Sequence, residues 1–217
     1  PTPRSPFPPM SHLAGTCLLL PLALVHLVAA QQVGAEARLA LPPIALGLWK
    51  TPRPQTAQAV LAALRAGYRM LDGAAAYGNE REVGYGLAQA VEQGIVRRED
   101  VVVVTKLPNT HHAWRQDRRR VAEALERSLR DLRLESIDLY LMHWPLAFGR
   151  QRNGRPNPRK VEVEFIETWR EMLRLKRAGK VKHIGVCNFT IEQLRALVVA
   201  FPDELLPEVN QVRRQPA

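Results

Sequence analysis

From about residue 42 onward, short apolar runs alternate with longer amphipathic segments, and this alternation limits most strongly how the chain can fold. The short runs are apolar at nearly every position, as expected of strands covered on both faces. In the longer segments apolar residues recur every three or four positions, as at Val121, Leu125, Leu129 and Leu132, which is typical of helices. Strands that alternate with helices predict a parallel sheet in an α/β fold.

The alternation predicts six strands and five helices. The expected strands lie at residues 44–48, 69–72, 101–107, 137–144, 183–189 and 207–212. The expected helices lie at residues 56–67, 79–94, 118–133, 163–179 and 191–200. Three glycines, Gly67, Gly94 and Gly179, stand where helices are expected to end.

Two architectures have this serial order, an open doubly wound sheet and a (β/α)8 TIM-type barrel. An open nucleotide-binding sheet usually has a glycine-rich loop after its first strand, but "LGLWKTPRP" has no G-x-G-x-x-G pattern. No phosphate-binding G-x-x-x-x-G-K-[ST] pattern occurs either. We therefore expect a barrel over residues 42–217. A closed barrel has eight strands, so this one is incomplete by about two strand–helix units.

Residues 1–41 differ in character from the rest, because a proline-rich start precedes Met10 and the run "CLLLPLALVHLVAA". This run is too short for a membrane span, and its length and small-residue ending suit a secretory signal peptide over residues 10–30. No Lys or Arg lies between Met10 and the run, which weakens that interpretation. The alternative is a gene-model artefact. We expect no membrane span.

The formal net charge of +10 raises the question of an anionic partner. The basic residues are scattered over amphipathic segments, and no zinc-finger or RNP-like spacing occurs, so we do not expect nucleic-acid binding. The two cysteines, Cys17 and Cys187, lie far apart in dissimilar contexts and predict neither a disulfide framework nor a metal cluster. Cys187 is interpreted as a lone reduced thiol, and no bound metal is expected.

Polar residues stand at the ends of the predicted strands, where the side chains of parallel strands converge on one site. They are Trp49, Asp72, Lys106, His143, Asn188 and Gln211, with Tyr77 just beyond the second strand.

Four of these residues also have ordinary structural interpretations. Asp72 could cap the next helix. Tyr77 could be a half-buried turn residue, and Lys106 could be solvated beyond its strand. His143, between two apolar residues, could be a histidine of the core.

Together the same four residues predict a site that donates a proton. The phenol of tyrosine has a pKa near 10, which a neighbouring ammonium lowers. A carboxylate would hold that lysine in place, and a neutral imidazole would orient a carbonyl oxygen. No Ser or Cys stands beside a His at these strand ends, so acyl transfer is not expected. His111 and His112 are interpreted as loop residues and not as metal ligands.

Several long motifs, in order, resemble the aldo-keto reductases, a family of NADP(H)-dependent (β/α)8 barrels. "GYRMLDGAAAYGNEREVG" resembles the first signature of the family, and "VVVVTKL" resembles its lysine strand. "LERSLRDLRLESIDLYLMHWP" resembles the stretch that ends in its catalytic histidine. "GKVKHIGVCNF" and "EVNQV" resemble two strand ends that contact the nicotinamide. The resemblance covers about residues 42–212.

The resemblance implies reduction of an aldehyde or ketone to an alcohol by hydride transfer from the cofactor. The implied catalytic residues are Tyr77 as general acid, Lys106 and Asp72 as its tuning pair, and His143 as the group that orients the carbonyl. The implied cofactor-binding residues are Asn188, Gln211 and Asp72. The implied substrate-binding residues are Trp49, Trp144 and His143, with the loop insertion from Ala147 to Lys160 shaping the pocket.

Some positions depart from the family pattern. Ala45 and Leu48 replace a glycine and a threonine at the first strand end, and Leu48 is expected to change how the nicotinamide approaches. Gly73 stands where a small polar residue or Cys is common. The family residues that stack on nicotinamide and grip the 2′-phosphate cannot be assigned, so the choice of NADP over NAD rests on family habit.

We therefore expect a truncated product of low activity, with a non-catalytic cofactor-binding or regulatory barrel, or a non-functional fragment, as the alternative. Family habit also implies a small carbonyl substrate and a monomer for a complete barrel. It implies a cytoplasmic location as well, with the secretory pathway as the alternative if residues 10–30 form a signal peptide.

Overall fold

The structure is a computed structural model that describes residues 39–113, 118–150, 156–161 and 165–212. Nearly all of the segment 1–41, including the signal-peptide interpretation of residues 10–30, lies outside the described residues. No helix within the described ranges is long and apolar enough to cross a membrane.

The described residues contain a six-stranded parallel sheet in the order β1-β2-β3-β4-β7-β8. Its strands are β1 (Leu46–Gly47), β2 (Met70–Asp72), β3 (Val102–Leu107), β4 (Ile137–Met142), β7 (Val181–Cys187) and β8 (Asn210–Gln211). The helices between them are α2 (Arg53–Arg65), α3 (Glu80–Glu92), α4 (Arg119–Leu132), α5 (Phe165–Arg177) and α6 (Ile191–Ala200). The predicted incomplete (β/α)8 barrel is confirmed.

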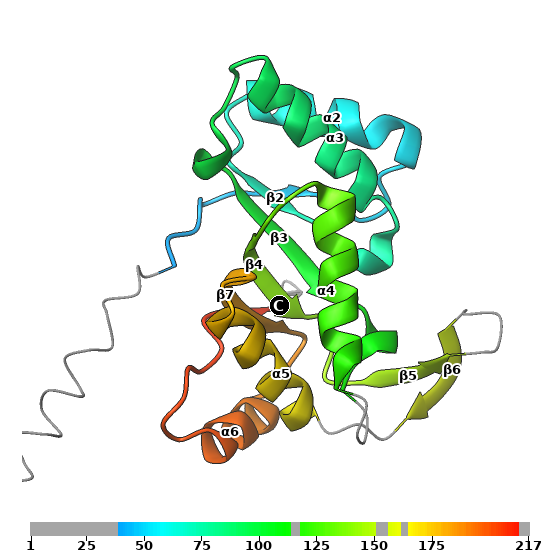
Figure 1. The fold of residues 1–217 in the computed structure, drawn as a ribbon, viewed down its shortest axis with the longest axis vertical. Coiled ribbons are helices and arrows are strands. Elements are labelled where there is room, and N and C mark those ends of the chain that lie inside the picture. The colour runs from blue at the N-terminus through cyan, green and yellow to red at the C-terminus, as the bar shows by residue number, and fades with distance from the viewer. Residues whose placement is uncertain (1–38, 114–117, 151–155, 162–164, 213–217) are drawn as a thin grey trace, which may run out of the picture. The chain divides into compact units, whose positions relative to one another are not determined.

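The helices line up in chain order along the sheet, from α2 and α3 beside β2 to α5 and α6 beside β7 (Figure 1). Their starts and stops follow local chemistry. Thr190 caps α6 in a capping box with Gln193. The three glycines expected to end helices all have positive φ, which glycine adopts without a Cβ penalty. At Gly84 a Cβ would lie 2.7 Å from backbone atoms of Asp131 and Leu132, so α3 and α4 pack closely only because this residue has no side chain.

The two faces of the sheet carry different cores. The large core lies between the sheet and the helices and includes Tyr140 of β4 and Trp169 of α5. A smaller interior layer lies on the other face, where Met70, Val104 and Leu141 come from neighbouring strands. Because side chains alternate along a strand, each strand supplies both layers. This alternation decides which residues at the strand ends face the interior.

The segment after β4 differs from the expected loop. β5 (Ala147–Arg150) and β6 (Pro156–Val161) pair as an antiparallel two-stranded sheet with a register shift at Phe148 and Arg150. Sequence reasoning missed the pair because its composition lacks the apolar alternation that marks a half-buried strand. The pair extends away from the larger sheet (Figure 1).

Candidate active site

The polar residues of the candidate site lie at one edge of the sheet because of the two-residue period of the strands. Asp72, Lys106 and His143 each follow an apolar residue of the interior layer by two positions. They therefore face the same interior, one step closer to the carboxyl ends of β2, β3 and β4. The parallel register carries all three ends to the same edge of the sheet.

Lys106, which is buried, and Asp72, which is partly buried, form an ion pair. The Lys106 Nζ donates to Asp72 Oδ1 at 2.5 Å and to the carbonyl oxygen of Gly73 at 2.8 Å. The side chain of Lys106 is only 1% exposed and that of Asp72 is 21% exposed. The solvated alternative for Lys106 is wrong. Asp72 is not a helix cap either, because α3 begins at Glu80.

Tyr77 closes a short 3-10 turn, η1 (Ala75–Tyr77), that Gly78 ends with a φ of 71°. The turn places the Tyr77 ring near both the Lys106 ammonium and the His143 imidazole. The Lys106 Nζ lies 5.3 Å from the ring centroid, and the His143 ring lies edge-on at 5.9 Å between centroids. The phenol, the ammonium and the imidazole therefore lie close together, although their residues are far apart in sequence.

The pKa of Tyr77 differs from the sequence expectation. Burial raises it to about 12, with the charges of Asp72 and Cys187 adding to the rise. The Lys106 ammonium, which is bound to the Asp72 carboxylate, does not reverse this direction. Burial is the largest cause, so burial decides the direction. Tyr77 therefore carries its proton throughout the neutral range.

His143 is held in its neutral form. Burial and then the Lys106 ammonium lower its pKa to about 4, against the opposing effect of Asp72. Its Nδ1 is buried and has no hydrogen-bond partner among the described residues. A neutral imidazole has one donor and one acceptor nitrogen, so His143 can donate to a carbonyl oxygen without carrying a charge.

The lowered pKa of His143 predicts acid sensitivity. The folded pKa near 4 lies below the ordinary value of 6.5, so the unfolded chain binds the proton first as the pH falls. The stability held above pH 6.5 is therefore lost between about pH 6.5 and 4. Urea unfolding of His143→Gln should show a shallower decline over this window than the original chain. His112, whose pKa burial also lowers to about 4, supplies a matched variant, His112→Gln, with the same expectation.

Ring-proton NMR of His143 checks the same point directly. We expect no titration between pH 5.5 and 8. A midpoint near 6.5 would contradict the assignment of a neutral imidazole.

A second polar group stands at the ends of β7 and β8. The Asn188 Nδ2 donates to the carbonyl oxygen of His143 and to the Cys187 Sγ, both at 3.1 Å. The Cys187 thiol lies 3.7 Å from Gln211 Oε1. Asn188 has a φ of 62°, which turns its side chain back toward β4. The lone thiol of the sequence analysis therefore lies beside two of the three predicted cofactor residues, Asn188 and Gln211, and its place at a strand end was the signal that could have marked it.

A cavity of about 870 Å³ opens beside the Tyr77 turn. Its wall includes His143 and Trp144, which follow β4, and Phe148 of β5. Trp144 is 42% exposed, so its ring is available to an apolar ligand. Trp49 does not line this cavity and is 63% exposed, with the Lys50 Nζ 4.6 Å from its ring centroid. Of the two predicted substrate tryptophans, only Trp144 is joined to His143 by the cavity.

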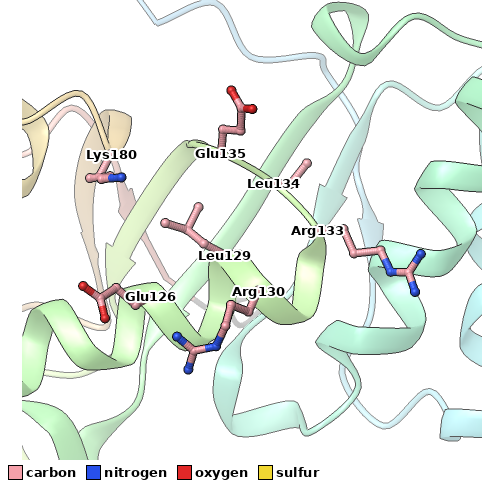
Figure 2. Close-up of a pocket in the computed structure, with 7 residues that line it drawn as sticks. All are labelled: Glu126, Leu129, Arg130, Arg133, Leu134, Glu135 and Lys180. Atoms are coloured by element: carbon pink, nitrogen blue, oxygen red, sulfur yellow. The ribbon is translucent and has the colours of Figure 1, made fainter.

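Another hollow, of about 710 Å³, lies at the opposite end of the strands (Figure 2). Its side chains come from the last turns of α4, the loop that follows and Lys180 before β7, and they mix both signs of charge. Arg133 points away from Lys180 toward α3, where its guanidinium lies 3.8 Å from the Tyr85 ring centroid. In a parallel α/β fold the amino ends of strands serve stability, so we do not place the site here.

One further expectation is wrong. Leu48 is buried in the core between sheet and helices, so its side chain does not face the space where the nicotinamide was expected to approach. His112 follows a short 3-10 turn in the loop after β3, as expected of a loop residue, but it is 1% exposed and its Nδ1 lies 3.2 Å from Thr168 Oγ1. No group of three or more His, Cys, Asp or Glu suited to a metal ion occurs within the described ranges.

Comparison with known proteins gives a match to the model of the aldo/keto reductase family over residues 43–216. The chain belongs to the aldo/keto reductase family. It is 42% identical over 182 residues to aldo-keto reductase family 1 member A1-A of Danio rerio, covering 81% of this chain and 54% of the relative. It is 36% identical to the NAD(P)H-dependent D-xylose reductase of Candida tenuis, covering 81% of this chain and 56% of that protein.

Solved structures of this family agree with the fold. An aldo-keto reductase of Bombyx mori in complex with NADP matches with a TM-score of 0.70 and 37% identity, covering 80% of this chain and 55% of that one. The aldose reductase of Schistosoma japonicum matches with a TM-score of 0.72 and 34% identity, covering 81% and 58%. The chain thus spans a little more than half the length of these aldo/keto reductases.

Proposed function

We propose that the chain carries the catalytic half of an NADP(H)-dependent oxidoreductase that reduces an aldehyde or ketone to an alcohol. One observation carries this proposal: the Tyr77 phenol, the Lys106 ammonium and the His143 imidazole converge at the carboxyl edge of the sheet. Membership in the family and the NAD(P)H dependence named for its relatives support it.

In this proposal Tyr77 is the general acid. Its proton stays in place at neutral pH and passes to the carbonyl oxygen as that oxygen becomes negative. The Lys106 ammonium, held over the ring by Asp72 and Gly73, stabilises the phenolate that remains. His143 donates a hydrogen bond that orients the carbonyl. The cavity beside Trp144 and Phe148 would hold the rest of the substrate.

The residues at the ends of β7 and β8 fit a nicotinamide cofactor. Asn188 and Gln211 carry amide groups, which can both donate to and accept from the carboxamide of a nicotinamide. Gln211 contributes only its oxygen, to a long contact with Cys187, so its amide nitrogen has no hydrogen bond among the described residues. When bound, the cofactor supplies the hydride that the carbonyl carbon receives.

The test is a spectroscopic assay on the purified chain. NADPH fluorescence should change on binding, and absorbance at 340 nm should fall when an aromatic aldehyde is added. NADH in place of NADPH compares the two cofactors. A chain that folds and binds NADPH but does not oxidise it with any of a panel of aldehydes and ketones would contradict the proposal.

That last outcome describes a second candidate, a non-catalytic cofactor-binding barrel. One observation favours it: the pKa of Tyr77, near 12, is higher than efficient proton donation near neutrality favours. Binding with a stoichiometry of one and no turnover would identify it.

A further inference from the structure

Glu80 is a buried carboxyl group that the proposed chemistry does not use. It begins α3, three residues after Tyr77, and is only 6% exposed. Its Oε1 accepts a hydrogen bond from Thr105 Oγ1 at 2.6 Å, and its Oε2 accepts one from Ser128 Oγ at 3.1 Å. The two oxygens therefore connect α3 to β3 and to α4.

Thr105 stands directly before the lysine of the site. Successive side chains of a strand point to opposite faces, so Thr105 faces the helices while Lys106 faces the interior. The bond from Thr105 to Glu80 holds the strand on its outer face. The bonds from Lys106 to Asp72 and Gly73 hold it on the inner face. The position of the ammonium is thus fixed from both sides of the sheet.

Asn79 fixes the other side of the Tyr77 turn. Its Nδ2 donates to the carbonyl oxygens of Leu48 at 3.0 Å and Thr51 at 3.3 Å. Asn79 and Glu80 together connect the turn to the ends of β1 and β3. The separation of the phenol from the ammonium depends on both connections, because the two groups come from different elements.

We propose that Glu80 is a positioning residue that, through Thr105, sets the separation between the Lys106 ammonium and the Tyr77 ring. Glu80 also lines the cavity of about 870 Å³, but both of its carboxyl oxygens are engaged, by Thr105 and Ser128. Its consequence for turnover rests on the proposed reductase function, whereas its geometric consequence can be measured without turnover. The competing explanation is that Glu80 merely stabilises the fold.

Three variants separate these explanations. Thr105→Val keeps the shape of the side chain and removes the bond to Glu80. Glu80→Gln keeps an oxygen that can accept from Thr105, so it is the conservative replacement. Tyr140→Phe is the matched control, because Tyr140 of β4 is the register partner of Thr105 of β3. Its buried hydroxyl has no hydrogen-bond partner among the described residues.

The first readout is fluorine NMR of the full chain labelled with 3-fluorotyrosine. The chain has four tyrosines, and the loss of a signal in Tyr77→Phe assigns the resonance of position 77. We expect Thr105→Val to shift this resonance and to leave the resonances of Tyr68 and Tyr85 in place. Glu80→Gln and Tyr140→Phe should both retain the original position.

The second readout is the kinetics of aldehyde reduction. Thr105→Val should lower kcat roughly 10- to 100-fold with little change in KM, because a small misplacement of a proton-donating group affects the rate and not the binding. Glu80→Gln should retain most of the rate of the original chain. If the original chain does not turn over, the proposed function fails, and the fluorine spectra still decide the role of Glu80.

Two results would overturn the inference. One is an unchanged Tyr77 resonance in Thr105→Val. The other is a shift of every tyrosine resonance, which would mean that the bond only stabilises the fold. If Thr105→Val does not fold, Glu80→Asp takes its place with the same expectations, since it keeps the charge and withdraws the carboxyl by one methylene.

Discussion

Tyr77→Phe is expected to lower kcat/KM for aldehyde reduction roughly 100- to 10,000-fold, the range that a general acid contributes. The phenylalanine ring keeps the edge-on packing against His143 and the place beneath the Lys106 ammonium. The only atom removed is the oxygen that would donate the proton. NADPH affinity should therefore stay close to that of the original chain, and the measurement is a paired binding and turnover assay.

Tyr85→Phe is the matched control for this change. Tyr85 lies on α3, is 37% exposed, packs against Arg133 and does not line the cavity. Loss of the Tyr85 hydroxyl should leave turnover unchanged. Equal activity of Tyr77→Phe and Tyr85→Phe would mean that Tyr77 is not the proton donor.

Lys106→Met is expected to lower both turnover and stability. Removing the ammonium leaves the Asp72 carboxylate and the Gly73 carbonyl without their donor in a largely buried place. Removing one partner of such an ion pair costs about 3 kcal/mol of unfolding free energy. Turnover should fall roughly 100- to 1,000-fold because the phenolate loses its stabilising charge. Urea unfolding and the aldehyde assay measure the two effects.

Two further variants separate the effects of Lys106→Met. Adding Asp72→Asn to it removes the unpaired charge, so part of the stability should return while turnover stays low. Lys182→Met removes a lysine that pairs with Asp138 at the opposite end of the strands but is 53% exposed. Asp138 is buried but keeps its bonds from Arg98 and the Val103 N–H, so the loss of the half-exposed lysine should cost about 1 kcal/mol or less. A stability loss in Lys182→Met as large as that in Lys106→Met would contradict the burial argument.

The strands and helices could be predicted because each leaves a local pattern. The β3 run and the amphipathic α4 were placed within a residue or two, since apolar periodicity reports burial directly. β1 was predicted at five residues and has two, because its pairing with β2 at Leu46 and Gly47 depends on a partner distant in sequence. The β5 and β6 pair has no such periodicity and was not predicted.

The roles of individual side chains were harder to predict than their positions. Sequence reasoning placed Lys106 beside Tyr77 and expected a lowered pKa for the phenol. The tertiary structure binds that ammonium to Asp72, a residue 34 positions away. Burial of the phenol, with the Asp72 charge adding to it, raises the pKa of Tyr77 instead. Glu80 carried no signal beyond its place in the Tyr77 motif, because its two hydrogen bonds reach Thr105 and Ser128 on other elements.

The sequence by itself determined which side chains reach the carboxyl edge of the sheet. Two local regularities suffice for this, the two-residue period of a strand and the parallel direction that a strand–helix repeat imposes. Only the tertiary structure decided how those side chains are charged and spaced. Burial and ion pairing depend on every neighbour of a group, and the neighbours of Tyr77, Lys106 and His143 come from different strands and turns.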